Sequence, residues 1–518
     1  MGIVNIIGAG MAGLSAAISL SEKGIRCNLV SVQTSERAQS VLAEGGLNAA
    51  LNSMDDGDSP EIHFSDTIKA GMDMADEEAV RGLTSSAPEI IRQLRILGVP
   101  FNTDKGRLLQ RPFGGQSKKR TVFSKSSTGQ VVMTALIDKV RFYEAKGLVT
   151  RYPHHEFSRL ELSCGNCGGV EISDLYTSKR IILYGPVILA FGGMNGLFPG
   201  MTTGTTANSG NAAARVFSQG VLLSNLEMIQ YHPTTMAISG KRCVISEAAR
   251  GEGGRLFIEK AGRPWYFMEE KYPKLKNLMP RDVVSREMFF AANDKSCSGP
   301  VCLDMTGISE TIWNTRLSDL RSEIIEYTRQ DPAKNPIPVA PGIHYFMGGI
   351  DTDARHRTNI SGLFAAGECC SQYHGANRLG GNSMIGAMYG GHIAALEAAK
   401  VARDSEPCSV AFSNALSRPS NESVEKTRKI LGRALGIVRD GESLKDALVE
   451  LKNLMARYPQ DSIESMRILL CQAIVGSALL RKESRGAHYR SDYPDKDDSL
   501  LCITTAICDG KEVNLAFK

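Results

Sequence analysis

The chain has 518 residues, of which 42% are apolar and 22% charged, and its formal net charge is +4. This composition is ordinary for a well-packed globular protein, and the length predicts roughly three domains. The small net charge and the lack of a basic run interleaved with aromatic residues argue against nucleic-acid binding.

The apolar and cysteine patterns indicate a cytoplasmic protein that does not itself span a membrane. No run reaches the ~18 uninterrupted apolar residues that cross a bilayer, and the first residues read as a core strand instead of a signal peptide. The twelve cysteines are scattered, which is typical of reduced thiols. Cys164 and Cys167 form a CxxC pair without a second pair for zinc, which favours a tight hairpin turn over a metal or redox site.

The N-terminal segment has the pattern of a βαβ unit. An apolar strand at 3–7 is followed by the loop GAGMAG, a helix ending at Gly24, and a strand at 25–30. Gly8, Gly10 and Gly13 in this setting would let the backbone approach a pyrophosphate at the helix N-terminus. Ser31 stands where an NAD-dependent enzyme normally carries Asp or Glu, which disfavours a plain NAD enzyme.

Later elements are expected in the following order. Residues 186–193 form a strand that returns to the same sheet, 225–338 form an inserted domain, and the sheet resumes at 362–368 before a helix at 383–403. A polar linker at 405–421 precedes a helix whose face carries Leu444, Leu448, Leu451 and Met455, with Ser443 as its N-cap, and then a second helix at 463–482. The tail is expected to form a hairpin around Asp509 and Gly510.

Polar residues cluster in five short runs. A lone histidine such as His232 is more often structural than a ligand, but five such runs in a chain with nine histidines favour one shared anion-binding site. The last run ends in Arg378, just before a second glycine loop and a helix N-terminus, which suggests a large cofactor beside an anionic substrate. The runs are QYHPT (230–234), SEAARGEGG (246–254), MPRDVVS (279–285), HYFMGG (344–349) and HGANR (374–378).

These runs, in this order, resemble the flavoprotein subunits of fumarate reductase and succinate dehydrogenase, a superfamily that includes L-aspartate oxidase. The resemblance covers nearly the whole chain, including the late run at 481–494. It implies an α/β fold with a Rossmann-like FAD-binding domain, an inserted α+β capping domain and a C-terminal helical domain. The implied boundaries are 1–224 and 341–404 for the FAD-binding domain, 225–340 for the capping domain, and 405–518 for the helical domain with its terminal hairpin.

The resemblance also implies how a dicarboxylate would be bound. Arg378 and His344 would hold one carboxylate, and His232 and Ser246 the other. Ser246 stands where the family usually has threonine, but it keeps the hydroxyl. Phe113 would pack against the substrate.

The implied chemistry is reduction of fumarate to succinate, by hydride from N5 of reduced FAD and a proton from Arg281. Glu247 and Arg250 would return the proton to Arg281. Because the pKa of arginine lies above ~12, such an acid needs a closed, dry site in which carbanion charge develops. A purely electrostatic role for Arg281 is the alternative.

Several segments are implied to hold FAD. The glycine pairs at 45–46 and 192–193 would allow the backbone to approach the cofactor closely, with simple tight turns as the alternative. The N-terminus of the helix after Gly381 would stabilise a reduced, negatively charged flavin. The implied contacts are Gly8, Ala9, Gly10, Met11, Ala12, Gly13, Ser31, Gln39, Ser40, Ala43, Glu44, Gly45, Gly46, Phe157, Gly192, Gly193, Asn211, Glu368, Ser383 and Met384.

Two positions depart from the family pattern. Gln39 stands where membrane-complex members carry the histidine that links to the flavin, so FAD is expected to be non-covalent, and fumarate reduction to be favoured over succinate oxidation. Asn211 stands where the family usually has an aspartate on the FAD side, which implies a weaker contact there, with substitution by amide contacts as the alternative.

Alternative functions remain at this point. L-aspartate oxidase also holds FAD non-covalently, but it has an acidic residue and a histidine around its own Gly-Gly run, whereas the run at 111–116 is of the fumarate reductase kind. A second alternative is a reductase of another α,β-unsaturated acid, because pocket shape sets substrate choice. A third is a subunit with only an assembly role.

The chain has no haem or iron–sulfur motif, so its electrons must come from elsewhere. An iron–sulfur partner subunit is the family expectation, and a soluble donor such as reduced flavin or a thiol is the alternative. A place in anaerobic electron transport is expected, in the cytoplasm or held at the inner face of the membrane through a partner.

Overall fold

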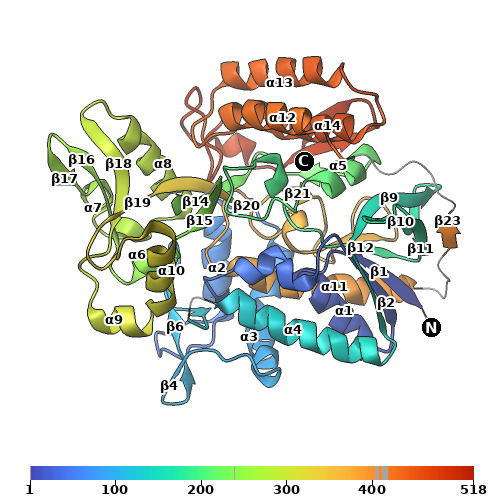
Figure 1. The fold of residues 1–518 in the computed structure, drawn as a ribbon, viewed down its shortest axis with the longest axis horizontal. Coiled ribbons are helices and arrows are strands. Elements are labelled where there is room, and N and C mark those ends of the chain that lie inside the picture. The colour runs from blue at the N-terminus through green and yellow to red at the C-terminus, as the bar shows by residue number, and fades with distance from the viewer. Residues whose placement is uncertain (1, 126, 239, 403–407, 411–417) are drawn as a thin grey trace.

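In the computed structural model, which describes residues 2–125, 127–238, 240–402, 408–410 and 418–518, a five-stranded parallel sheet organises the N-terminal region. Its order is β22-β12-β1-β2-β8. Figure 1 labels the three central strands, β12, β1 and β2. The expected βαβ unit and the two returning strands are therefore confirmed. The strands are β1 (Ile3–Ile7), β2 (Arg26–Ser31), β8 (Val149–Pro153), β12 (Val187–Leu189) and β22 (Leu363–Ala365).

Helices α1 (Met11–Glu22) and α11 (Asn382–Val401) pack tightly against each other. A Cβ on Gly391 would lie 2.2 Å from the carbonyl oxygen of Ala12, so only glycine allows this approach. The expected helix at 383–403 thus begins one residue earlier and ends at Val401; Arg403 lies outside the described residues. Because α1 follows β1 and α11 follows β22, both helix N-termini lie at the same edge of the sheet.

A second sheet, β9-β10-β11-β23, lies beside the first and contains the CxxC pair. Cys164, with φ 48°, and Gly165, with φ 76°, form the turn between β9 (His155–Ser163) and β10 (Asn166–Asp174). Two positive φ values are typical of a type I′ hairpin, so the predicted turn is confirmed. Strand β11 (Arg180–Tyr184) pairs with β23 (Cys408–Val410), a short strand inside the expected linker; most of that linker lies outside the described residues.

A separate lobe, olive to yellow-green in Figure 1, projects from one side of the molecule. It is connected to the rest through the sheet β15-β14-β20 and has its own core around Phe267 and Trp313. Its elements are β14 (Ile229–Ile238), β15 (Lys241–Val244), α6 (Glu247–Gly251), β16 (Arg255–Lys260), β17 (Arg263–Trp265), α7 (Phe267–Lys271), α8 (Arg281–Asn293), β18 (Cys297–Asp304), α9 (Glu310–Thr315), α10 (Ser318–Thr328), β19 (Ile337–Pro338) and β20 (Ala340–Phe346).

The C-terminal segment forms helices α12 (Asn421–Ala434), α13 (Gly441–Met455) and α14 (Ile463–Leu480) at the top of Figure 1. The predicted N-cap Ser443 is wrong: α13 is capped by Asp440, whose carboxylate accepts from the Ser443 N–H at 2.8 Å. Ser443 thus lies at N3, the position that donates to the cap. Helix α14 ends two residues before the predicted Lys482.

Helix α14 is the one helix within the described residues that is long and apolar enough to cross a membrane. However, 78% of it is buried within the fold, which is typical of a core helix. The tail forms the expected hairpin, β24 (Thr504–Cys508) and β25 (Val513–Phe517), and β24 pairs with β13 (Leu223–Ser224), which in turn pairs with β21 (Gly349–Ile350).

The late run at 481–494 packs against the loop that carries Arg378. The N–H of Ala487 donates to the carbonyl of Ala376 at 2.9 Å. Gly486 has φ +57°, and a Cβ there would lie 2.5 Å from that same carbonyl. Nearby, buried Arg481 is 2.8 Å from the carboxylates of both Glu227 and Glu483. Removing one partner of such a buried pair typically costs ~3–5 kcal/mol, so this cluster holds the tail firmly behind the loop.

The remaining elements cover the sheet and border the site. They are β3 (Leu47–Asn48), α2 (Pro60–Ala70), α3 (Glu77–Ile96), β4 (Thr103–Asp104), β5 (Arg107–Leu108), β6 (Gln110–Arg111), β7 (Thr121–Val122), α4 (Thr128–Ala145), α5 (Asn211–Ser218), and the 3₁₀ turns η1 (Ser35–Arg37), η2 (Gln39–Leu42), η3 (Asn195–Leu197), η4 (Lys276–Leu278), η5 (Gly367–Cys369) and η6 (Asp498–Leu500).

Candidate active site

One large cavity, of about 270 Å³, extends from the first glycine loop to the inner side of the lobe. It gathers residues that are far apart in the sequence: the loop 8–12, the segment 31–46, the loop 190–193 that follows β12, and the segment 378–387. Every predicted site residue lines this cavity except Gly13, Arg250 and Asn211. Within the described residues, no group of three His, Cys, Asp or Glu side chains could hold a metal ion.

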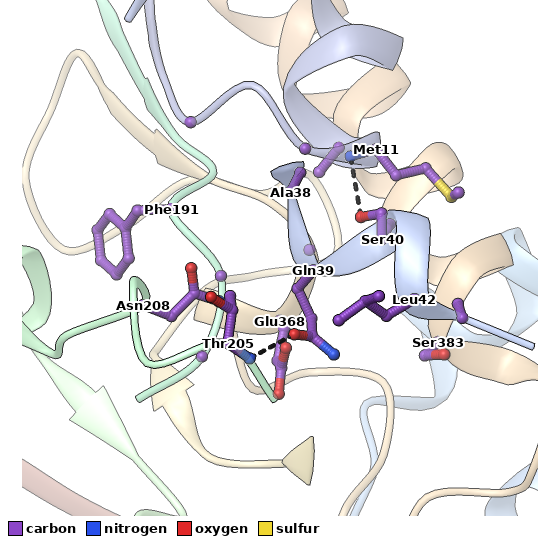
Figure 2. Close-up of a pocket in the computed structure, with 18 of the residues that line it drawn as sticks. Met11, Ala38, Gln39, Ser40, Leu42, Phe191, Thr205, Asn208, Glu368 and Ser383 are labelled. Atoms are coloured by element: carbon purple, nitrogen blue, oxygen red, sulfur yellow. Dashed lines mark hydrogen bonds between the residues drawn. The ribbon is translucent and has the colours of Figure 1, made fainter. Parts of the chain in front are cut away.

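The first glycine loop is shaped for close approach. A Cβ on Gly8 would lie 2.1 Å from the carbonyl oxygen of Ala190, and one on Gly13 would lie 1.8 Å from that of Gly8. Gly13 therefore serves the packing of helix and strand, which explains why it does not line the cavity. The hydroxyl of Ser40 accepts from the N–H of Met11 at 3.2 Å, so η2 is tied to the start of α1 (Figure 2).

Gln39 joins the 31–46 segment to the loop before α5. Its side-chain oxygen accepts from the N–H of Thr205 at 2.6 Å, as the dashed line in Figure 2 shows. Thr205 and Asn208 also line the cavity, although the sequence patterns did not single them out. The glycines and threonines of TTGTTANSG (202–210) were the available signal, since such loops often approach a ligand.

Two partly buried carboxylates, Glu44 and Glu368, line the cavity. Burial raises the pKa of Glu368 to about 7, although its side chain accepts from the N–H of Phe346 at 3.2 Å. Burial, with a smaller effect from Glu323, raises the pKa of Glu44 well above its ordinary value against the attraction of Arg111. One oxygen of Glu44 has no hydrogen-bond partner within the described residues. Both groups are thus suited to contact a polar ligand in the cavity.

Asn211 lies behind the cavity wall. Its side-chain oxygen accepts from Arg467 at 2.8 Å, and its amide donates to Glu156 at 3.1 Å. The side chain therefore links α5 to α14 and to β9. Asn211 itself does not line the cavity, although its neighbours Gly210 and Ala212 do, so a cofactor contact for Asn211 stays a prediction.

Arg281, Glu247 and Arg250 form a buried chain at the lobe end of the cavity. The Nε of Arg281 donates to Glu247 Oε2 at 2.9 Å, and an Nη of Arg250 lies 3.6 Å from Glu247 Oε1. The N–H of Gly114 also donates to Oε1 at 2.6 Å. Burial opposes the charge on Glu247, but Arg281, Arg250 and Gly114 together lower its pKa below the ordinary value. Glu247 is therefore ionised between two cations, and of these only Arg281 lines the cavity.

His232 and His344 face each other at the same end, with ring centroids 5.1 Å apart. Nδ1 of His344 lies 2.8 Å from the Thr203 hydroxyl, and Nδ1 of His232 lies 3.2 Å from the Thr234 carbonyl oxygen. Burial, followed by the nearby Arg281, holds the pKa of both rings well below the ordinary value. Both rings are thus neutral, and a neutral imidazole can still donate one N–H to a carboxylate.

Ser246 and Phe113 complete this end of the cavity. Ser246 is buried at the start of α6, directly before Glu247. The ring of Phe113 lies against both glycine loops: a Cβ on Gly45 or on Gly380 would lie 3.1 Å from it. The ring is 2% exposed and forms an apolar wall beside the polar groups.

Gln230 and Asn377, which the sequence did not single out, connect the two cavity arginines. The side-chain oxygen of Gln230 accepts from Arg281 Nη1 at 3.1 Å, and its amide donates to the carbonyl oxygen of Arg378 at 2.8 Å. Asn377 accepts from Gln230 at 2.8 Å and donates to Asp282 at 2.9 Å. The one sequence feature that could have indicated them is that they lie within the QYHPT and HGANR runs.

Arg378 is a buried cation without an anionic partner. Its side chain is 3% exposed, and within the described residues no carboxylate lies within ion-pair distance of it. Burial, with repulsion from Arg281, lowers its pKa to about 9, so the guanidinium is charged at neutral pH. A buried and unpaired cation facing a cavity is a strong site for an anion.

Comparison with known proteins shows what the chain is similar to. The FAD binding domain family matches residues 4–384, and the family described as fumarate reductase flavoprotein C-term matches residues 464–518. The chain is 36% identical to a succinate dehydrogenase flavoprotein subunit of Bacillus subtilis, over 96% of this chain and 92% of that protein. It is 33% identical to a fumarate reductase flavoprotein subunit of Mycobacterium tuberculosis, over 97% of this chain and 94% of that protein. Among solved structures, a variant of the quinol fumarate reductase chain FrdA of E. coli is similar with a TM-score of 0.89 and 27% identity, covering 100% of this chain and 96% of that one.

Proposed function

The chain belongs to the family of succinate dehydrogenase and fumarate reductase flavoproteins, and on that basis we propose that it reduces fumarate to succinate with non-covalently held FAD. The single observation that carries the proposal is the meeting, at one end of the cavity, of unpaired Arg378 and the ion-paired Arg281. One cation is free to bind a carboxylate, and the other is connected to a proton relay.

The cavity residues fit FAD. The N-terminus of α1 and the open backbone of Gly10 suit a pyrophosphate, and Glu368 suits a sugar or ribityl hydroxyl because its carboxylate faces the cavity. When bound, FAD supplies the two-electron chemistry. Gln39 cannot form the histidyl bond to the flavin and is already engaged with Thr205, which supports non-covalent attachment.

Arg378 and His344 would bind one carboxylate of the substrate, and His232 with Ser246 the other. Neutral histidines suit this task, since they donate a hydrogen bond without requiring a proton from solvent. The two carboxylates would thus be held at opposite sides of the reacting carbons, and Phe113 would exclude water from one face. Such positioning lowers the entropic part of the barrier.

Arg281 would donate the proton. An arginine releases a proton only where negative charge develops beside it in a dry site. The cavity end fits this requirement, because Arg281 is 7% exposed and its neighbours are buried. Glu247, ionised and 2.9 Å away, is placed to return a proton to Arg281, and Arg250 to supply Glu247 from outside the cavity.

The relatives named above are described as subunits, which supports a multi-subunit assembly for this chain. We propose an iron–sulfur partner subunit as the electron donor, with a soluble donor as the alternative. A cytoplasmic location, at the membrane face through such a partner, agrees with the burial of helix α14.

A steady-state assay of the FAD-loaded chain with reduced viologen and fumarate tests the function. We expect turnover with fumarate, and no hydrogen peroxide from L-aspartate in air. Peroxide from aspartate without fumarate turnover would instead identify an aspartate oxidase. Failure with every dicarboxylate, with and without a partner subunit, would leave only an assembly role.

A further inference from the structure

We propose that Tyr345 is a positioning residue that stabilises the charge of Arg378 without competing for the substrate carboxylate. The proposal rests on the proposed function, because it takes Arg378 as a carboxylate-binding residue. Tyr345 lies at the end of β20, next to His344, and lines the same cavity. The guanidinium carbon of Arg378 lies 4.4 Å from the centroid of the Tyr345 ring.

The need for such support follows from what surrounds Arg378. Its Nε is buried without a hydrogen-bond partner, and its side chain makes no ion pair within the described residues. A second cation, Arg281, disfavours the charge, whereas the carboxylates of Glu368 and Glu247, which lie beyond ion-pair distance, favour it. By contrast, Arg281 is held by the carboxylate of Glu247 at 2.9 Å. The two cavity arginines are therefore stabilised in different ways.

An aromatic face suits Arg378 better than a carboxylate would. The face of a ring carries partial negative charge and attracts a guanidinium by up to about the energy of a hydrogen bond when both are desolvated. Since a ring carries no net charge, it leaves the cation free to pair with an incoming anion. A protein carboxylate in the same place would have to be displaced before the substrate could bind.

Tyr345 is itself held in place. Its hydroxyl oxygen lies 3.3 Å from Nε2 of His374, and the two rings meet edge to face with centroids 5.3 Å apart. His374 packs in turn against Tyr373, with centroids 6.0 Å apart. Burial keeps Tyr345 protonated and His374 neutral, since it raises the pKa of the phenol and lowers that of the imidazole. The ring of Tyr345 is thus held at its hydroxyl end by a neutral group.

The test compares Tyr345→Leu, which removes the ring, with Tyr345→Phe, which keeps the face and removes the hydroxyl. The holoenzyme is titrated with malonate, a dicarboxylate that cannot be reduced, and binding is measured by calorimetry. We expect the Leu variant to bind malonate at least tenfold more weakly, which is about 1.4 kcal/mol, and the Phe variant to remain within about threefold of the parent. Tyr143→Leu, in α4 and outside the cavity lining, is the control for loss of a buried tyrosine.

A second measurement separates positioning from a general structural effect. The high-pH limb of kcat/KM for fumarate reports the charge of Arg378, so it should move to lower pH in the Leu variant and stay in place in the Phe and Tyr143→Leu variants. If the Leu variant does not retain FAD, Tyr345→Met fills a similar volume without a ring and takes its place.

Equal malonate affinity in the parent and the ring-less variant would overturn the proposal, as would a Phe variant as weak as the Leu variant. A parent holoenzyme that binds no dicarboxylate at all would instead overturn the proposed function. Retained malonate affinity in the Tyr345→Phe variant, together with a shifted high-pH limb in the Tyr345→Leu variant, would establish the role of the ring.

Discussion

Glu247 lies 2.9 Å from the guanidinium of Arg281, and both residues line the cavity. The pair is buried, and the second oxygen of Glu247 faces Arg250 at 3.6 Å. A carboxylate bridging two arginines can receive a proton on one side and pass it on at the other. On the proposed function, this arrangement would let Arg281 act as a proton donor and not only as a cation.

Arg281→Lys should lower the rate of fumarate reduction by at least about a hundredfold, the lower range for loss of a general acid. Lysine keeps the charge but cannot bond Glu247 and Gln230 at the same time from a planar group. The flavin absorption spectrum should be unchanged, which shows that FAD is still bound. Turnover within a few-fold of the parent would restrict Arg281 to an electrostatic role.

Arg378→Ala should mainly weaken substrate binding. Loss of a charge-assisted hydrogen bond to a carboxylate typically costs ~1.5–3 kcal/mol, so KM for fumarate should rise by about tenfold to a hundredfold. Initial rates over a wide fumarate range give KM and kcat separately. An unchanged KM would mean that the carboxylate is bound elsewhere.

The affinity for dicarboxylates should fall as pH rises through about 9, because the pKa of Arg378 lies at about 9. The sign follows from the charge: the guanidinium is cationic below this pH and neutral above it, whereas the substrate carboxylates stay ionised. The measurement is kcat/KM for fumarate between pH 7 and 10.5. The same profile in Arg378→Ala should lack this limb, and a limb that persists there would belong to another group.

FAD should leave the protein completely on acid precipitation. Gln39 has no nucleophilic nitrogen comparable to an imidazole, and its amide oxygen is bonded to the N–H of Thr205. The check is the flavin absorbance of the supernatant against that of the pellet. Yellow colour that stays with the denatured protein would show a covalent bond at some other residue.

Much of the fold could be predicted because its signals are local. The strand at 3–7, the glycine loop and the helix after it form one continuous pattern, and the structure has them at those positions. The short strand β23 could not be predicted, because its pairing with β11 depends on residues more than 220 positions away. The N-cap at Asp440 was missed because Asp440 and Ser443, both residue types that cap helices, lie within one turn of each other. Which of them is the N-cap depends on where the helix begins.

The site could be predicted in its parts but not in its connections. The five polar runs gave Arg281, His344 and Arg378, all of which line one cavity. Residues such as Gln230 and Tyr345 act through contacts across the fold, and no spacing in the sequence reveals those contacts. Asn211 shows the converse. The family pattern singled it out, but did not reveal that its side chain is hydrogen-bonded to Arg467 and Glu156.

The most direct measurement compares the two directions of the reaction on one preparation. Fumarate reduction is followed with reduced viologen, and succinate oxidation with a dye acceptor. Because non-covalent attachment should leave the flavin potential low, we expect reduction to exceed oxidation by more than tenfold, which corresponds to ~1.4 kcal/mol or more in barrier. Equal rates in both directions would contradict this, and would show that the cavity, including the N-terminus of α11, raises the potential without a covalent bond.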